Sequence, residues 1–283
     1  MFMTAAAGFA LPDPLYDNDQ LFFAEPGPPS ASFRIQRLGT YLVSDLFIAK
    51  QTIKSDFVHE QRLVTLCRGK ELFFTGQRFS QWDLDVLLYC SLNTSPQGND
   101  PGKFRFTPVE LLHALNMRNS PANRSRVFES LQRLHTGVID IRGRDYQYMT
   151  RLMNRVLVDT RKERCLVEVN GDVADCFRMG GIDRGIRARQ SLSRNGLAKW
   201  IHGATMVFRG GFTAEMESLR HLCHVTAGQR HSFPNMLAKA LELLESSGCI
   251  EHWHINGTSI QVTSRSIRER KTMCGVFHPG VCS

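Results

Sequence analysis

Basic and amide side chains gather in two stretches of this sequence, at spacings that suit contact with nucleic acid. In the first stretch they surround a helical pattern whose apolar positions are Val127, Leu131 and Leu134. Arginine binds guanine and asparagine binds adenine through paired hydrogen bonds, and several cations together neutralise phosphates. The residues predicted to contact DNA here are Arg118, Asn119, Asn123, Arg124, Arg126 and Arg133. An arginine-rich face that is simply solvated is the alternative explanation.

The second stretch joins a helical pattern to a β-hairpin pattern. Polar side chains recur along the helical part on the side away from its apolar stripe, and others lie in or just after the hairpin. The residues predicted to contact DNA in this stretch are Gln229, Arg230, His231, Asn235, Lys239, Thr258, Ser259, Gln261 and Arg265. Pro234 must lie in the first turn of the helix or kink it, because proline has no N–H to donate.

Local signals predict the elements that position the second stretch. Thr213 is a favourable N-cap, so a helix is expected to follow it. A second helix is predicted to stop at Ser247-Gly248. Strand-like runs at 250–255 and 259–263 meet across Asn256-Gly257, which is a strong hairpin signal. The apolar positions of the two helices are Met216, Leu219, Leu222, Phe233, Leu237, Leu241 and Leu244.

The same order of elements is predicted around the first stretch. A helix follows Ser80, and Thr107-Pro108-Val109-Glu110 is a capping box with proline at the first helical position. Ser120-Pro121 opens the next helix and Gly137 ends it. The strand-like runs are a hairpin of 62–67 with 71–75, and then 138–142, 146–158 and 164–169.

Helix, turn, helix and hairpin is the order of a winged helix-turn-helix, which places its second helix in the major groove of DNA. The order occurs twice, so we predict an α+β protein with two tandem winged-helix domains. The predicted divisions are a flexible arm at 1–35, domains at 36–170 and 171–265, and a loose tail at 266–283. The arm is rich in proline and alanine, a composition that cannot bury a core.

Bulk composition agrees with a polyanionic partner. The chain has 283 residues and a formal net charge of +8, which leaves room for about two domains. Between Gly102 and Cys165 there are thirteen Lys and Arg residues and six Asp and Glu residues, so the excess of positive charge is local.

The cysteines and the hydropathy indicate the compartment. Eight cysteines without C-x-x-C spacing predict a reducing cytoplasm. No apolar run reaches the roughly 18 residues of a membrane span, so we expect no membrane contact.

Other chemistries find less support. His252 and His254 share one face of a predicted strand and could hold a metal ion, as in a metal-dependent nickase, but no tyrosine nucleophile follows them. His221, Cys223, His224 and Cys249 match no zinc-site spacing. The sequence also lacks a phosphate-binding P-loop. We therefore expect no catalytic residues, no metal and no cofactor.

A resemblance narrows the prediction. The run from Asn195 to Gly203 (Asn-Gly-Leu-Ala-Lys-Trp-Ile-His-Gly), with Arg189-Gln190-Ser191-Leu192 before it, resembles the TrfA-type initiators of plasmid replication. Further similarity lies at Gln81–Val86 and at 219–223 and 240–248, so the resemblance extends over most of 36–265.

The resemblance implies an initiator that binds repeated origin sites (iterons), melts adjacent AT-rich DNA and recruits the host initiator, helicase, helicase loader and sliding clamp. It also implies a homodimer in equilibrium with an active monomer, Trp200 in a core, and Lys199 as a phosphate contact. The clamp peptide of the family is matched in part by Asp45-Leu46-Phe47, with Gln20–Phe23 as a rival and burial of Leu46 and Phe47 as the alternative. A winged-helix transcriptional regulator is the other candidate function.

Overall fold

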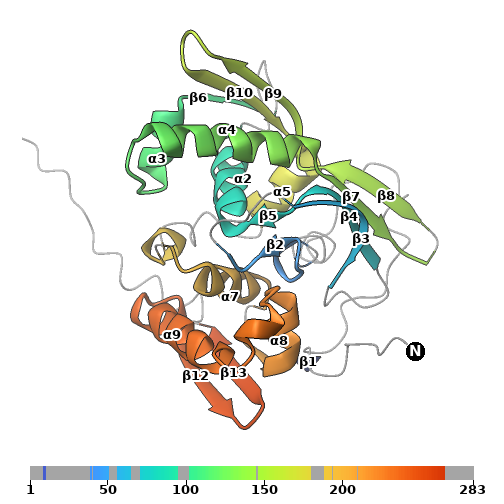
Figure 1. The fold of residues 1–283 in the computed structure, drawn as a ribbon, viewed down its shortest axis with the longest axis vertical. Helices are drawn as coiled ribbons and strands as arrows, with labels where there is room; N and C mark the ends of the chain where they lie inside the picture. Colours follow the sequence, from blue (N-terminus) through green and yellow to red (C-terminus); the bar gives the residue numbers. More distant parts are fainter. Residues whose placement is uncertain are drawn as a thin grey trace, which may run out of the picture.

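The computed structural model places helices and strands in two units that repeat one order: helix, strand, two helices, two strands (Figure 1). The chain is thus a mixture of helices and strands, as predicted. The structure describes residues 9–10, 39, 41–50, 56–64, 71–94, 102–144, 146–179, 188–192, 194–208 and 210–264.

The first unit is built around a three-stranded sheet in the order β6-β10-β9, with α2 and α4 packed on it and α3 packed against these two helices. Its elements are α2 (Gln81–Asn93), β6 (Lys103–Phe106), α3 (Pro108–Ala114), α4 (Pro121–Thr136), β9 (Met153–Asp159) and β10 (Arg164–Val169). All strands of this sheet run antiparallel. The core stripe predicted for α4, Val127, Leu131 and Leu134, is fully buried.

The predicted helix starts of this unit are confirmed. Ser80 and Asp83 form a reciprocal capping box at α2, and Thr107 and Glu110 form another at α3. Ser120 caps α4 with its side chain, and proline occupies the first turn of both α3 and α4. These bonds satisfy backbone N–H groups that have no partner inside the helix.

A second sheet lies beside the first unit, in the order β3-β4-β7-β8. Its strands are β3 (Phe57–Leu63), β4 (Glu71–Gln77), β7 (Val138–Arg142) and β8 (Gln147–Arg151). The strand predicted at 146–158 is therefore two strands, which belong to different sheets. The chain changes sheets at Leu152. This fully buried residue follows β8, which pairs with β7, and precedes β9, which pairs with β10.

The second unit repeats the order with a four-stranded sheet, β1-β11-β13-β12. Its elements are α7 (Gly196–Val207), β11 (Phe212–Glu215), α8 (Met216–Leu222), a 3-10 turn (Ala227–Gln229), α9 (Phe233–Ser246), β12 (Ile250–Asn256) and β13 (Ser259–Ser264). The predicted Asn256-Gly257 hairpin is confirmed, with Gly257 at a φ of 57°. Pro234 lies in the first turn of α9, so the helix is not kinked.

One helix start in this unit was predicted wrongly. Thr213 is not an N-cap but a strand residue, paired with Gln261 across β11 and β13. Its neighbours Phe212 and Ala214 are buried, which is the alternation of a half-buried strand. Glu215 takes the N-cap position of α8 without a side-chain cap bond. Threonine is favourable both at N-caps and in strands, so the local sequence does not distinguish the two.

Three segments lie outside the repeated elements. Helix α5 (Gly171–Met179) lies on the first unit, where Arg178 donates a 2.7 Å hydrogen bond to the carbonyl oxygen of Thr94. The two-residue strand β1 (Phe9–Ala10) lies in the predicted arm and pairs with β11 of the second unit. Residues 41–50 contain β2 (Phe47–Ile48), which runs parallel to β5 (Phe79–Ser80).

The described cysteines are buried thiols. Cys90, Cys165, Cys176, Cys223 and Cys249 form no disulfide. Burial raises the pKa of Cys165 to about 11, so this thiol stays protonated and unreactive at neutral pH. Across the described residues, none of the helices combines the length and hydropathy required to cross a lipid bilayer.

Candidate nucleic-acid interface

The outward face of α4 differs from the face that the sequence predicted. A helix turns about 100° per residue, so positions one residue before the core stripe lie beside that stripe and not opposite it. Arg126 and Arg133 each precede a core residue, Val127 and Leu134, and both are only partly exposed. The residues exposed along the outward face of α4 are Ala122, Ser125, Glu129, Gln132 and Thr136.

Arg126 and Arg133 instead pack against α2. The guanidinium of Arg126 lies 4.4 Å from the ring centre of Trp82, and burial lowers the pKa of this arginine. Arg133 forms a 2.8 Å ion pair with Asp83, whose side chain is fully buried. Both cations therefore contribute to the packing of α4 on α2, and the predicted direct DNA contact of Arg133 does not fit this position.

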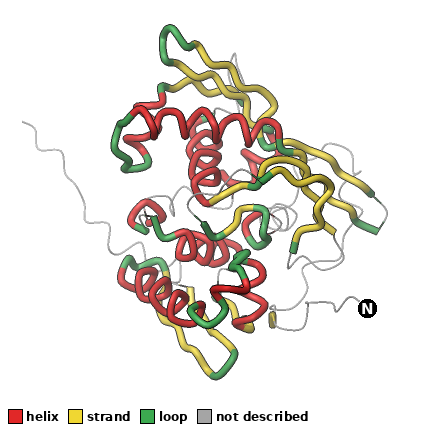
Figure 2. The backbone as a smooth tube through the Cα atoms, viewed as in Figure 1, coloured by secondary structure: helices red, strands yellow, loops and turns green. Residues whose placement is uncertain are grey.

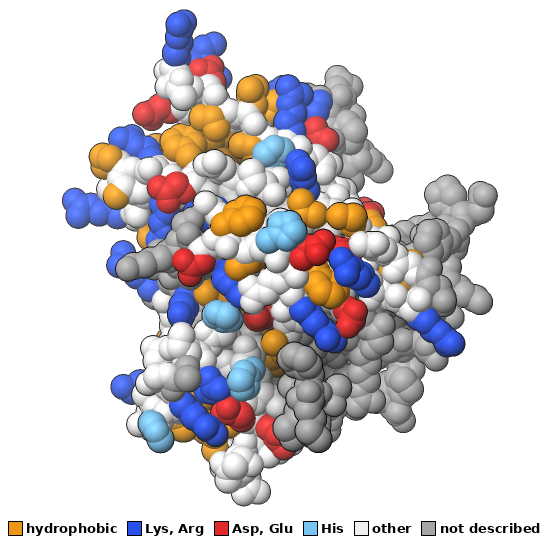
Figure 3. All heavy atoms as spheres, turned by 45° about the vertical axis from the view of Figure 1, so that its right-hand side comes forward, with side chains coloured by type: hydrophobic (Ala, Val, Ile, Leu, Met, Phe, Trp, Pro, Cys, Tyr) orange, Lys and Arg blue, Asp and Glu red, His pale blue; other side chains and the backbone are white. Residues whose placement is uncertain are grey.

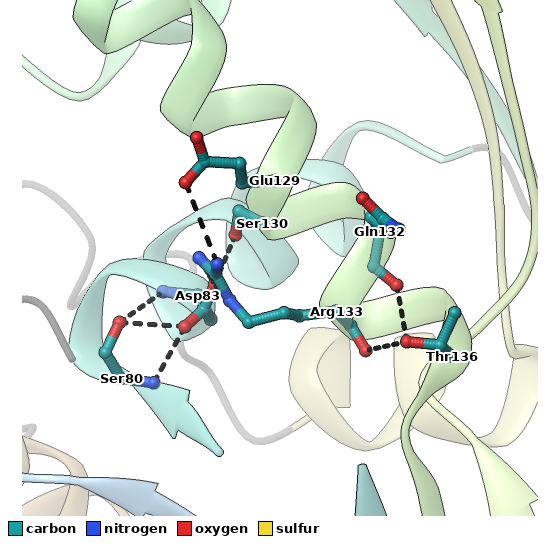
Figure 4. Close-up of polar contacts among 7 residues, drawn as sticks. All are labelled: Ser80, Asp83, Glu129, Ser130, Gln132, Arg133 and Thr136. Carbon is teal, nitrogen blue, oxygen red and sulfur yellow. Dashed lines mark hydrogen bonds and ion pairs between the residues drawn. The ribbon is translucent and has the colours of Figure 1, made fainter. Parts of the chain in front are cut away.

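Asp83 is the centre of a buried polar network at the start of α2 (Figure 4). Its Oδ1 atom accepts hydrogen bonds from Ser130 at 2.6 Å and from two nitrogens of Arg133 at 2.8 and 3.1 Å. Its Oδ2 atom accepts from the backbone N–H and the hydroxyl of Ser80, both at 2.8 Å. One carboxylate thus caps α2 and fixes the rotation of α4 at the same time.

The first turn of α4 keeps part of the predicted set at the surface. Arg118 and Asn119 are exposed, whereas the Asn123 side chain donates a 2.7 Å hydrogen bond to the carbonyl oxygen of Arg118. Arg124 lies 3.7 Å from Glu163, which belongs to the turn between β9 and β10. The start of α4 and the end of the hairpin therefore lie side by side.

That hairpin carries cations which the sequence reasoning did not assign. Asp159 accepts hydrogen bonds from the backbone N–H groups of Arg161 and Lys162, at 3.0 and 3.1 Å, and both side chains are exposed. Arg155 and Arg164 are exposed on the two strands. Figure 3 shows Lys and Arg side chains at the upper end of the molecule, where this hairpin ends. The adjacent cations Arg161 and Lys162, between two strand-like runs, were the sequence signal that could have identified this hairpin as a candidate DNA contact.

In the second unit the predicted reading residues are at the surface. Gln229, Arg230, His231, Asn235 and Lys239 are all exposed along the turn before α9 and its outward face. Thr258 and Gln261 are exposed on the hairpin, and Ser259 is partly exposed. Arg265 lies outside the described residues. Their exposure is compatible with the predicted contacts, which remain predictions.

The turn between α8 and α9 is fixed by Arg220. This buried arginine donates hydrogen bonds from its Nε and Nη2 atoms to Glu217 and from its Nη1 atom to the carbonyl oxygen of Val225, at 2.7 Å. The hydrogen bond from Arg220 lowers the pKa of Glu217 to about 2. Arg230 lies 3.7 Å from the same glutamate, so Glu217 also restrains the turn that precedes α9.

Two sets of predicted contacts are in the interior. Lys199 is buried and forms a 2.6 Å ion pair with Asp85, so its ammonium group is not positioned for the predicted phosphate contact. Asp45, Leu46 and Phe47 are also buried, because this segment packs between the two units, and it does not present a peptide to a clamp. Trp200 lies in the core, as predicted. The rival segment Gln20–Phe23 lies outside the described residues.

His252 and His254 lie on one face of β12, as the strand period requires. Both are exposed, and His252 contacts Glu245 at 3.4 Å. In the part of the chain that the structure describes, no three His, Cys, Asp or Glu side chains are grouped to hold a metal ion.

Replacing both histidines with alanine should therefore leave DNA binding within about twofold of the wild type, since changes of exposed side chains have small effects and the contact of His252 with Glu245 is itself exposed. Affinity measured on one duplex with and without Mg²⁺ or Mn²⁺ would check this. Strand cleavage that depends on metal and is lost in the double variant would revive the nickase hypothesis.

Comparison with solved structures assigns a fold to most of the chain. A crystal structure of selenomethionine derivatives of domains 2 and 3 of RctB aligns with a TM-score of 0.58 at 10% identity, over 82% of this chain and 98% of that chain. Another crystal structure of RctB domains 2–3 aligns with a TM-score of 0.56 at 8% identity, over 80% and 98%. The Pi initiator protein in complex with iteron DNA aligns at 0.44, with 11% identity over 65% and 90%. Protein-family models and curated proteins give no match.

Proposed function

We propose that this protein is a plasmid replication initiator that binds repeated sites at an origin through two winged-helix units. The observation that carries the proposal is the repeated order of helix, strand, two helices and hairpin, with exposed polar side chains on the third helix of the second unit and cations on the hairpin of the first. In winged-helix proteins these two elements meet the major groove and the adjacent backbone.

The two units can contact separate segments of DNA. Their hairpins, β9–β10 and β12–β13, project from opposite ends of the molecule (Figure 2). Two such readers on one chain suit a site with two parts, as repeated origin sequences provide. The fold shared with RctB domains 2 and 3 supports the assignment of the architecture, and the resemblance to TrfA-type initiators favours an origin as the target.

The later steps are also part of the proposal. By resemblance, the bound protein melts adjacent AT-rich DNA and recruits the host initiator, helicase, loader and clamp, with the monomer as the active form. The protein performs no covalent step in this scheme. A transcriptional regulator with the same units would bind an operator and stop there.

A selection followed by footprinting tests the proposal. The full-length protein would be used to select duplexes from a random-sequence pool and from fragments of the DNA that flanks its gene, and hydroxyl radicals would map the contacts. We expect repeated protected segments beside an AT-rich stretch that becomes reactive to permanganate when the protein binds. Protection without permanganate reactivity would favour the regulator, and the absence of any selected sequence would contradict both.

Asn235 offers the sharpest test of base reading in the second unit. Its side chain is exposed on the first turn of α9, and asparagine distinguishes adenine by two hydrogen bonds. Asn235→Ala should cost about 1–3 kcal/mol on the selected duplex and relax the preference at one base pair. Ser246→Ala, an exposed change at the other end of the same helix, is the matched control. Equal effects of the two changes would remove Asn235 from the interface.

A further inference from the structure

Helix α2 carries two buried carboxylates that serve different units. Asp83 and Asp85 are two residues apart, so they point to nearly opposite sides of the helix. Asp83 bonds to α4 of the first unit, as described above. Asp85 bonds to Lys199 of α7 in the second unit and to Arg189 in the segment 188–192, which precedes α7.

The guanidinium of Arg189 donates hydrogen bonds to three acceptors. Its Nε atom donates to Asp85 Oδ1 at 2.6 Å and its Nη2 atom donates to Gln81 Oε1 at 2.7 Å. Its Nη1 atom donates to the backbone carbonyl oxygen of Lys199 at 2.7 Å. Gln81 precedes Asp85 by one helical turn, so α2 offers both acceptors on a single face. A planar guanidinium bound in this way admits one orientation of the two units.

Lys199 completes the cluster from α7. Its Nζ atom lies 2.6 Å from Asp85 Oδ2, and its side chain is 7% exposed. Desolvation by burial lowers the pKa of Lys199, while the charge of Asp85 opposes that shift. Lys199 of the second unit and Arg189 of the segment before α7 therefore share one carboxylate of the first unit.

Other contacts join the second unit to residues 41–50, beside the cluster. The Trp200 indole donates a 3.1 Å hydrogen bond to the carbonyl oxygen of Ser44, and the backbone N–H of Ala49 donates to the carbonyl oxygen of Cys223 at 3.1 Å. A Cβ atom on Gly196 would lie 2.7 Å from the carbonyl oxygen of Ala49, so the start of α7 is in close contact with residues 41–50. The boundary is thus closely packed and polar at its centre.

We propose that Asp85, with Arg189 and Lys199, is a positioning cluster that sets the relative orientation of the two units. On the proposed function, on which this inference rests, the cluster then fixes the spacing between the two DNA segments that one molecule can contact together. Asp85 touches no DNA in this scheme and acts through the two cations.

The choice of charged groups supports an orienting role. A buried ion pair seldom stabilises a protein more than a well-packed apolar contact of the same volume. An apolar contact, however, tolerates small rotations, whereas two hydrogen bonds of 2.6 Å from two cations to one carboxylate do not. The cluster therefore fixes the relative orientation of the two units, which a protein that binds two sites at fixed spacing requires.

A cavity beside the cluster makes the test practicable. It has a volume of about 530 Å³ and is lined by residues of both units, Asp85, Tyr89, Leu115, Arg189 and Lys199 among them. Water can enter a polar cavity of this size. When the carboxylate is neutralised, the cations can be hydrated there, so we expect the two units to remain folded.

Two variants separate orientation from folding. Asp85→Asn removes the shared charge, and the triple variant Asp85→Leu/Arg189→Met/Lys199→Met replaces the cluster with apolar side chains. Asp175→Asn is the matched control, because it removes an exposed carboxylate that pairs with Arg178 on α5. Circular dichroism of each full-length protein establishes that it is folded.

Small-angle X-ray scattering of the free proteins gives a readout that needs no DNA. We expect both cluster variants to show a larger radius of gyration and a broader distance distribution than the wild type and the control. Wild-type scattering from a folded triple variant would overturn the proposal, even if Asp85→Asn proved unfolded. This measurement judges the cluster whether or not the proposed function holds.

The second readout uses a selected duplex with about five base pairs inserted between its two protected segments, which turns one segment by half a helical turn. The wild type and the control should lose about 10²-fold in affinity, as expected when one of two linked contacts is lost. The cluster variants should lose less than about threefold. Equal losses for all proteins would overturn the link to spacing, and failure to select any duplex would count against the proposed function alone.

Discussion

Asp83→Asn should lower the free energy of unfolding by about 3–5 kcal/mol, because it removes one partner of a buried ion pair. Asp83 is fully buried and accepts hydrogen bonds through both carboxylate oxygens, from Ser80 on one side and from Ser130 and Arg133 on the other. The amide group of asparagine must direct its NH₂ toward one of these sets of donors. Either the guanidinium of Arg133 or the donors of Ser80 are then left without an acceptor.

Urea denaturation, followed by circular dichroism, measures the effect. Glu129→Gln is the matched control, since Glu129 approaches the same arginine at 4.0 Å but is 60% exposed. Exposed ion pairs contribute at most about 1 kcal/mol, so this variant should resemble the wild type. A similar loss in both variants would mean that Arg133, and not the buried carboxylate, determines the stability of this contact.

The expected loss has a functional consequence. α4 is the element that would approach DNA in the first unit, and Asp83 fixes its rotation on α2 through Arg133 and Ser130. A variant that folds but lets α4 rotate should bind DNA more weakly, although no side chain proposed to contact DNA has been replaced. Binding and stability should therefore decrease together in Asp83→Asn.

Elements that depend on local chemistry were predictable from the sequence. The capping boxes at Ser80 and Thr107 and the hairpin at Asn256-Gly257 need only residues within a few positions of one another. The split of 146–158 into two strands was not predictable in this way, because it depends on two sheets whose other strands lie elsewhere in the chain.

Contacts between distant residues explain the errors in the candidate site. The helical period was sufficient to place Arg126 and Arg133 beside the core stripe of α4, but their partners on α2 lie far away in the sequence; 50 residues separate Arg133 from Asp83. The partner of Lys199 lies 114 residues away. No spacing rule connects such pairs, so these cations were predicted to be exposed, whereas Lys199 is buried and Arg126 and Arg133 are only partly exposed.

The segments that carry the family resemblance contain these buried contacts. Gln81 and Asp85 come from one segment, and Arg189 and Lys199 come from two others. The resemblance therefore concerns the contacts that join α2 to the second unit as well as the elements proposed to meet DNA.

Salt should weaken DNA binding steeply, and the hairpin of the first unit should account for part of the slope. If about 6–10 phosphates are contacted, affinity falls roughly 10³–10⁵-fold between 50 and 200 mM salt, because each neutralised phosphate releases counterions. Arg161 and Lys162 are exposed at the turn of β9–β10, beside the start of α4. Replacing both with alanine should reduce the slope of log affinity against log salt by about 2.

Arg62→Ala is the control for this change in charge, since Arg62 is 69% exposed on β3, in the second sheet, and pairs with Glu71. Its slope should equal that of the wild type. Fluorescence anisotropy of a labelled duplex at five or more salt concentrations gives each slope directly. A flat response in the wild type would contradict DNA as the ligand, whereas a steep response unchanged by the double variant would place the phosphate contacts elsewhere. Because the slope counts contacts and does not depend on the sequence of the duplex, it tests the electrostatic surface separately from base reading by Asn235.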